Sequence, residues 1–237
     1  MKIKSTVLKT GLVALFVLLA NAAMSATVYV CTGAAFSLGV TNLPAGTTAL
    51  WDVRQGGTSI AGYPSATAPT SFATAGSYEV ILVSITDATS GACTSDPVSN
   101  TVNALPPLAL TLGTPTNPAY CEGSGTAQDS EISAADAAVP AAYATDLGLT
   151  YTYSVNNGST TVDGATVGTV NATTGAFTLT TKTPGTYVIT GTVQYNQLAT
   201  NTTNNLLGNG CPFTSTTTRT VTVTPKPGQP TVTIAAN

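Results

Sequence analysis

Two stretches, Gly76-Ser-Tyr-Glu-Val-Ile-Leu-Val83 and Gly185-Thr-Tyr-Val-Ile-Thr190, begin in the same way and continue with residues of the same kind. Each opens on a glycine, a small hydroxyl residue and a tyrosine, and then runs on in β-branched and aliphatic residues. Runs of this kind, bounded by Gly, Pro, Asn and Ser, are typical of β-strands. We therefore expect the two stretches to be equivalent strands in two copies of one module.

The signals around both stretches follow one order. A cysteine is followed by an aromatic strand, a phenylalanine, the Gly-Ser/Thr-Tyr strand, a second cysteine, and a final strand that runs into a proline-containing linker. In chain order the pairs are Cys31 and Cys121, 49–53 and 149–153, Phe72 and Phe177, Cys93 and Cys211, and 100–103 and 219–224. Many short strands with closely spaced turn signals predict antiparallel β-sandwiches. The exception is the alanine-rich stretch 133–143, which favours a short helix before Pro140.

This pattern of Cys-x-Gly, aromatic strand, Gly-Ser/Thr-Tyr, Cys, Thr-Val and Pro resembles the Ig-like or PKD-like modules of Bacteroidetes surface proteins. The resemblance covers nearly all of the chain after residue 26. It implies an all-β fold of two tandem Ig-like antiparallel β-sandwiches, at 27–104 and 105–227. It also implies that Trp51 packs in the first core, near a disulfide, and that Tyr151 or Tyr153 replaces it in the second.

Residues 1–26 have the three regions of a signal peptide. Lys2, Lys4 and Lys9 precede an uncharged apolar run at 11–20, and small residues follow at 21–26. The apolar run is shorter than the about 20 residues that cross a bilayer. We therefore expect a secreted chain at the cell surface or in the medium, without a membrane span.

Charge and composition exclude several functions. After residue 26 four basic residues stand against ten acidic ones, which offers no track for phosphates and makes nucleic acid an improbable partner. The chain has no histidine, so a Ser-His-Asp site or a mixed Cys/His zinc site cannot be built. We expect neither enzymatic activity nor a cofactor. Charged residues make up 7% of the chain against about 25% in ordinary domains, and such a surface suits proteins that pack together.

The four cysteines predict disulfides, because an even number in an exported chain is typical of a disulfide framework. Three connectivities are open. The repeat favours Cys31 with Cys93 and Cys121 with Cys211, which gives each sandwich one disulfide.

The two ends of the chain complement each other. In the second module, 108–112 has three alternating leucines and precedes the cysteine, so it should be the first strand. The first module has room only for 27–30 before Cys31, and it therefore lacks this strand. After the linker at 225–230, Val232, Ile234 and Ala236 alternate with Thr231, Thr233 and Ala235, so 231–236 has the pattern of a first strand with no module behind it.

A sandwich without an edge strand exposes unpaired backbone groups and an apolar groove. The sequence therefore suggests that the C-terminal strand, 228–237, enters the first domain of another copy and builds a head-to-tail filament or pilus. The expected polymerisation residues are Thr231, Val232, Thr233, Ile234, Ala235 and Ala236. The alternatives are a frayed terminus, a piece of a longer array, or a monomeric adhesin or carbohydrate-binding module.

Two further clusters are candidate sites. Asp129, Glu131 and Asp136 are the only acidic cluster and are weak candidates for Ca²⁺ ligands, although a solvated loop is favoured. Tyr63, Tyr143 and Tyr195 are candidates for a face that binds surface glycans, although strand aromatics are more often core residues.

Overall fold

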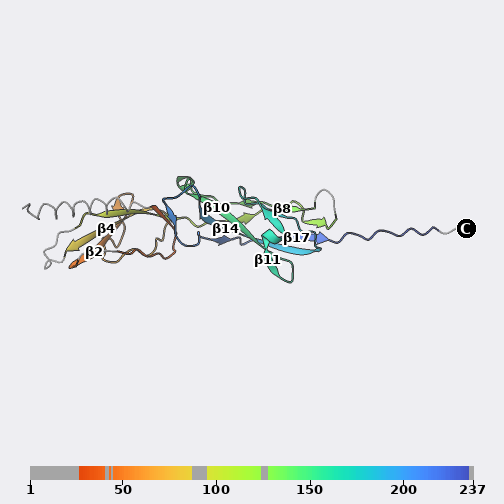
Figure 1. Ribbon diagram of the computed structural model, residues 1–237, viewed down its shortest axis with the longest axis horizontal. Coiled ribbons are helices and arrows are strands. Elements are labelled where there is room, and N and C mark those ends of the chain that lie inside the picture. Colours follow the sequence, from red (N-terminus) through yellow and green to blue (C-terminus); the bar gives the residue numbers. More distant parts are fainter. Residues whose placement is uncertain (1–26, 41–42, 44, 87–94, 124–127, 235–237) are drawn as a thin grey trace, which may run out of the picture. The chain divides into compact units, whose positions relative to one another are not determined.

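The computed structural model describes residues 27–40, 43, 45–86, 95–123 and 128–234 (Figure 1). The predicted signal peptide, Cys93, Ala235 and Ala236 lie outside these residues. The described chain consists of strands and connecting segments with two single-turn 3₁₀ helices, and the predicted all-β, Ig-like sandwich class is confirmed. It forms two compact units: the first is Met1–Pro107 with Gln197–Gly210, and the second is Leu108–Asn196 with Cys211–Asn237.

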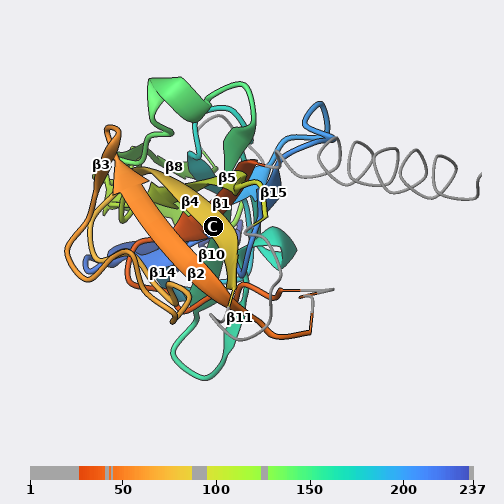
Figure 2. The ribbon, with the colours of Figure 1, turned by 90° about the vertical axis from the view of Figure 1, so that its left-hand side faces the viewer.

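One six-stranded sheet is the frame of the first unit, in the order β15-β1-β5-β4-β2-β3 (Figure 2). Strand β4 is antiparallel to both β2 and β5, whereas β1 runs parallel to β5. The bounds are β1 Thr27–Cys31, β2 Thr47–Gln55, β3 Thr58–Ser59, β4 Gly76–Thr86, β5 Val98–Leu105 and β15 Asn205–Leu206.

The second layer of the first unit is thin. Residues 33–40 and 60–75 pack against the sheet but form no regular strand among the described residues. Two backbone hydrogen bonds of 2.8 Å join the two segments, from the Gly33 N–H to the Phe72 carbonyl and from the Phe36 N–H to the Thr70 carbonyl. Phe72 also stacks on Tyr78 at 3.9 Å between ring centroids. The predicted core residue Trp51 is 6% exposed and belongs to this core.

A second sheet, in the order β11-β10-β14-β17-β7, is the frame of the second unit, and β16 pairs with β14. Strand β7 runs parallel to β17, as β1 does to β5. Of the two tyrosines considered for this core, Tyr153 is 4% exposed and donates a hydrogen bond of 2.6 Å to the Gly175 carbonyl. The bounds are β7 Ala119–Cys121, β10 Leu147–Asn156, β11 Thr161–Asp163, β14 Gly185–Gln197, β16 Phe213–Thr214 and β17 Arg219–Thr224.

The opposite layer of the second unit is built of regular strands. A three-stranded sheet, β12-β13-β8, is accompanied by the pair β6-β9. The expected helix within 133–143 is wrong: part of the stretch pairs as a strand, and the 3₁₀ turn follows Pro140 rather than preceding it. The bounds are β6 Thr111–Leu112, β8 Ser130–Ile132, β9 Ala134–Ala135, η1 Ala141–Tyr143, η2 Gly164–Thr166, β12 Gly168–Val170 and β13 Phe177–Leu179.

The cysteine pairing differs from the expected one. Cys31 is bonded to Cys211, and Cys121 is an exposed free thiol. The favoured pairs Cys31–Cys93 and Cys121–Cys211 are therefore wrong. The reason is the segment Gln197–Gly210, which belongs to the first unit although its sequence lies within the second repeat. This segment ends one residue before Cys211, and its strand β15 pairs with β1, which ends at Cys31.

Candidate functional site

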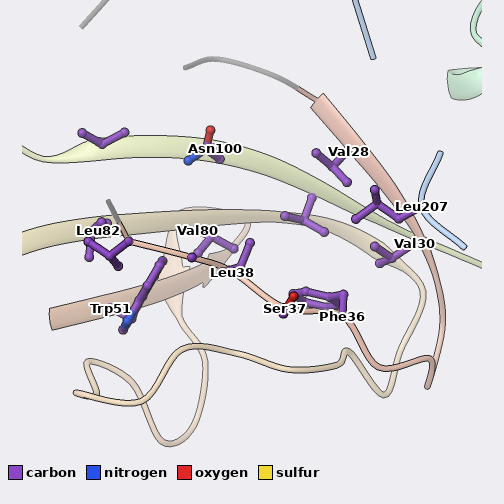
Figure 3. A pocket seen from close by; sticks show the side chains of 14 residues that line it. Val28, Val30, Phe36, Ser37, Leu38, Trp51, Val80, Leu82, Asn100 and Leu207 are labelled. Carbon is purple, nitrogen blue, oxygen red and sulfur yellow. The ribbon is translucent and has the colours of Figure 1, made fainter. Parts of the chain in front are cut away.

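An open apolar groove of about 410 Å³ lies on the first unit (Figure 3). Its floor comes from the sheet, where Val30, Val80 and Val102 are at most 2% exposed. Its rim includes Val28 and Leu82, which are only half-buried. The groove therefore presents apolar surface that the chain itself leaves partly uncovered.

One wall of the groove is the segment 36–40. Phe36, Leu38 and Val40 are half-buried and pack on the core, whereas Ser37 and Gly39 between them are exposed. This alternation is that of a strand, whose side chains point to opposite faces in turn. No backbone hydrogen bond joins 37–40 to any residue that the structure describes. The wall thus has the side-chain pattern of a strand, and its backbone is unpaired over 37–40.

The two ends of the groove come from different parts of the chain. Figure 3 shows Trp51 and Leu82 at one end, and Leu207 beside Val28 and Val30 at the other. Leu207 follows β15, and its N–H donates a hydrogen bond of 2.9 Å to the Tyr29 carbonyl. One end of the groove in the first unit is therefore formed by a residue whose sequence lies within the second repeat.

The lining of the groove is suited to binding apolar side chains. Ser37 and Asn100 are the only polar side chains among the lining residues, and none of those residues is charged. Binding there would gain about 1.5–3 kcal/mol for each aliphatic side chain that leaves water. An apolar segment with its own backbone donors and acceptors would suit both the lining and the unpaired wall.

The second unit buries an alternating apolar segment of its own, 108–112. Leu108, Leu110 and Leu112 are 5%, 4% and 0% exposed, so all three alternating leucines of 108–112 are buried. A Cβ atom added to Gly191 on β14 would lie 3.1 Å from both Leu110 Cδ2 and Leu112 Cδ2. Of the expected first strand 108–112, only Thr111–Leu112 forms a strand, β6, whereas 108–110 has no regular secondary structure although its leucines are buried.

Backbone carbonyl groups at the end of segment 108–113 also have hydrogen-bond partners. The Arg219 Nε on β17 donates hydrogen bonds to the carbonyls of Leu112, at 2.8 Å, and Gly113, at 3.0 Å. Strand β6 pairs antiparallel with β9, and beyond it the Gly113 N–H donates to the Ser133 carbonyl at 2.8 Å. The second unit therefore holds the end of this segment, 111–113, by backbone hydrogen bonds as well as by buried side chains.

The C-terminal segment is fully exposed over the part that the structure describes. Residues 225–234 have no secondary structure, and Val232 and Ile234 are 82% and 92% exposed. No backbone hydrogen bond involves Thr231, Val232, Thr233 or Ile234 among the described residues. Two large aliphatic side chains at i and i+2 thus remain in water at the end of the chain.

The other candidate residues do not assemble into sites. Asp129, Glu131 and Asp136 are all described, and no group of three potential metal ligands is found among the described residues. Tyr63 packs against the core of the first unit, whereas Tyr195, in the second unit, is 1% exposed. The three tyrosines therefore do not form one sugar-binding face. Over the same described part of the chain, no helix is long and apolar enough to cross a membrane.

Sequence reasoning missed the residues that build the groove. The alternation of Phe36, Leu38 and Val40 with small residues carried a signal, since it is the period of a strand. Leu207 carried none, because it lies in an Asn- and Thr-rich loop far from β1 in sequence. Only the folded position of Gln197–Gly210 places it at the groove.

No family model matches the chain, and no curated protein sequence matches it. Among solved structures, similar chains include three N-terminal domains of the highly immunogenic outer capsid protein of bacteriophage RB49, at 8% identity and a TM-score of 0.44. That match covers 86% of this chain and 69% of the other. Fibronectin(III)-like modules of Clostridium thermocellum CbhA match at 12% identity and a TM-score of 0.34, over 86% and 93%.

A third similar structure is the Bacteroides ovatus protein SGBP-B from a mixed-linkage glucan utilization locus, in complex with a heptasaccharide. It matches at 15% identity and a TM-score of 0.28, over 86% of this chain and 44% of the other.

Proposed function

We propose that this protein is a secreted subunit of an extracellular filament or pilus. In this filament the C-terminal strand of one copy fills the groove in the first unit of the next. The proposal includes the relationship to the Ig-like or PKD-like modules of Bacteroidetes surface proteins that the repeated pattern indicates. Its partners are copies of itself, and its role is structural rather than enzymatic.

The observation that carries the proposal is the difference between the two units. The second unit buries three alternating leucines of its own chain, whereas the first unit has an open apolar groove. Segment 231–234 has the same alternation and no partner among the described residues. A strand added to an unpaired edge gains main-chain hydrogen bonds from the edge and specificity from the side-chain pockets. Here the edge is 37–40 and the pocket is the groove.

The geometry of such a contact favours a chain of subunits over a closed pair. The donor is at the C-terminus and the acceptor is in the first unit, so the two surfaces are different. A contact between unlike surfaces propagates unless a rotation closes it. The near-absence of charge, at 7% of residues, leaves little repulsion between packed copies.

The test compares the chain that begins at Thr27 with the same chain ending at Pro227. Residues 228–234 are exposed, so we expect the truncated protein to fold with an unchanged melting temperature. Electron microscopy should find fibres of the longer protein and discrete particles of the shorter one. A synthetic peptide with the sequence of 228–237 should raise the melting temperature of the truncated protein, because it binds only the folded state.

Identical fibres from the truncated protein would rule out the C-terminal strand as the donor. Discrete particles from both proteins, with no effect of the peptide, would contradict the filament and leave the monomeric adhesin or carbohydrate-binding module. As a control, a peptide with Val232 and Ile234 replaced by Asp should leave the melting temperature unchanged, because two carboxylates would have to enter an uncharged groove.

A further inference from the structure

The segment Gln197–Gly210 forms one end of the groove. It leaves the long strand β14 and belongs to the first unit. Its strand β15 lies parallel to β1, with Asn205 opposite Val28 and Leu206 opposite Tyr29 (Figure 2). The next residue, Leu207, lines the groove and remains 42% exposed. Leu207 is therefore a large apolar side chain that comes from a distant part of the sequence, whereas the other lining residues of the groove lie between Val28 and Val102.

Side-chain hydrogen bonds hold this segment in shape. Asn201 is 8% exposed, and its Oδ1 accepts from the N–H groups of Thr203, at 3.3 Å, and Asn204, at 2.9 Å. The side chain of Gln197 spans the loop: its Nε2 donates to the Asn201 carbonyl, and its Oε1 accepts from the Leu206 N–H. The Cys31–Cys211 disulfide fixes the chain four residues beyond Leu207. These hydrogen bonds and the disulfide thus fix the position of Leu207 independently of anything that binds in the groove.

The second unit indicates the direction in which a strand would run along the wall. There Thr111 lies opposite Ala135, and the Thr116 N–H donates to the Glu131 carbonyl, so the two segments are antiparallel. A strand bound in the same sense beside 36–40 would start near Val40 and finish near Phe36. The end of this strand would then approach Val28, Val30 and Leu207, which lie together in Figure 3.

In that direction the inward residues of the C-terminal strand are two large aliphatic side chains followed by a small one. They are Val232, Ile234 and then Ala236, whereas the second unit uses leucine at all three positions of 108–112. We propose that Leu207 is the end stop of the groove. It occupies the space that a third large side chain of the entering strand would need, and so it selects a second copy whose inward residue at this place is Ala236. This inference rests on the proposed function.

The experiment measures binding of fluorescent peptides with the sequence of 228–237 to the chain 27–227. Ala236→Leu should weaken binding about tenfold, because overfilling a packed site is unfavourable. Ala235→Leu is the matched control: it adds the same side chain on the opposite, outward face, and should change the affinity less than threefold. In Leu207→Ala protein the preference should disappear, with the Ala236→Leu peptide binding as well as the original one.

Leu43→Ala protein is the control for loss of an exposed leucine, since Leu43 is 40% exposed and lies outside the groove lining. Equal binding of the Ala235→Leu and Ala236→Leu peptides would overturn the role of Leu207 and leave the filament intact. So would a tenfold preference that persists in Leu207→Ala protein. Failure of the original peptide to bind at all would overturn the proposed function and this inference together.

Discussion

The backbone N–H of Leu207 donates a hydrogen bond of 2.9 Å to the carbonyl oxygen of Tyr29. Through this bond a loop from the second repeat joins the first strand of the first sheet. The register of β15 on β1 extends the same contact over Val28 and Tyr29. The two compact units are consequently not two consecutive pieces of sequence, and the first one needs residues from both repeats.

Peptide mapping should detect the disulfide between Cys31 and Cys211. Digestion under non-reducing conditions should yield Cys31 linked to Cys211, and a maleimide should label Cys121 without prior reduction. Replacing Cys31 and Cys211 together by Ser should lower the free energy of unfolding by about 2–5 kcal/mol. Cys121→Ser is the matched control and should change it by less than about 0.5 kcal/mol, because its thiol is exposed and forms no disulfide. Peptides linking Cys121 to Cys211 would contradict the assignment.

Single charged substitutions in 231–234 should distinguish the inward from the outward face of the proposed C-terminal strand. Val232→Asp places a carboxylate on the inward face, and we expect fibre formation to fall at least a hundredfold in rate or extent. Thr233→Asp places the same carboxylate on the outward face, where it stays in water, and fibres should form nearly as before. The measurement is light scattering with electron microscopy of the end point. Equal loss in both variants would mean that charge, rather than the face, decides assembly.

A buried leucine of 108–112 and an exposed isoleucine of 231–234 should differ in whether they stabilise the monomer or its assembly. Leu110→Ala should lower the free energy of unfolding of the dilute monomer by about 2–5 kcal/mol, because Leu110 is 4% exposed and packs near Gly191 on β14. Ile234→Ala should leave that free energy unchanged, because Ile234 is 92% exposed, and should weaken only assembly. Urea unfolding measures the free energy of unfolding of the monomer, and light scattering measures assembly. A large loss of monomer stability in Ile234→Ala would mean that the tail packs on its own subunit.

Alkaline pH should destabilise the second unit through a buried tyrosine. Burial, with a smaller contribution from Tyr151, raises the pKa of Tyr153 from its usual value of 10.0 to about 12. The unfolded chain therefore releases this proton at lower pH than the folded chain does. The stabilisation is complete below pH 10 and is lost as the pH rises toward 12.

Tyr153→Phe tests this dependence. The variant loses the hydrogen bond to the Gly175 carbonyl, so its stability at neutral pH should drop by about 0.5–1.5 kcal/mol. Its stability should then fall less steeply between pH 10 and 12 than that of the original protein, because one titrating group is gone. Chemical unfolding curves at half-unit pH steps measure both effects. Parallel pH curves for the two proteins would contradict the role of Tyr153.

Local patterns predicted the strands well where one face of a segment is buried. The leucines of 108–112 alternate with Ala109 and Thr111, the valines of β17 alternate with threonines, and the structure buries the leucines and the valines. Composition misled in 133–143, where alanines favoured a helix. Pairing of Ala134 and Ala135 with β6 outweighed that intrinsic preference, because helix propensity amounts to less than about 1 kcal/mol per residue.

The sequence by itself determined the all-β, Ig-like class of the fold and the buried apolar face of 108–112, because each of these depends on residues that are neighbours in the chain. Tertiary structure alone decided the partner of Cys31 and the place of Leu207. Both depend on the path of Gln197–Gly210, which returns to the first unit by pairing β15 with β1. Such a path is fixed by contacts between residues far apart in sequence, and a periodic pattern of neighbouring side chains cannot predict it.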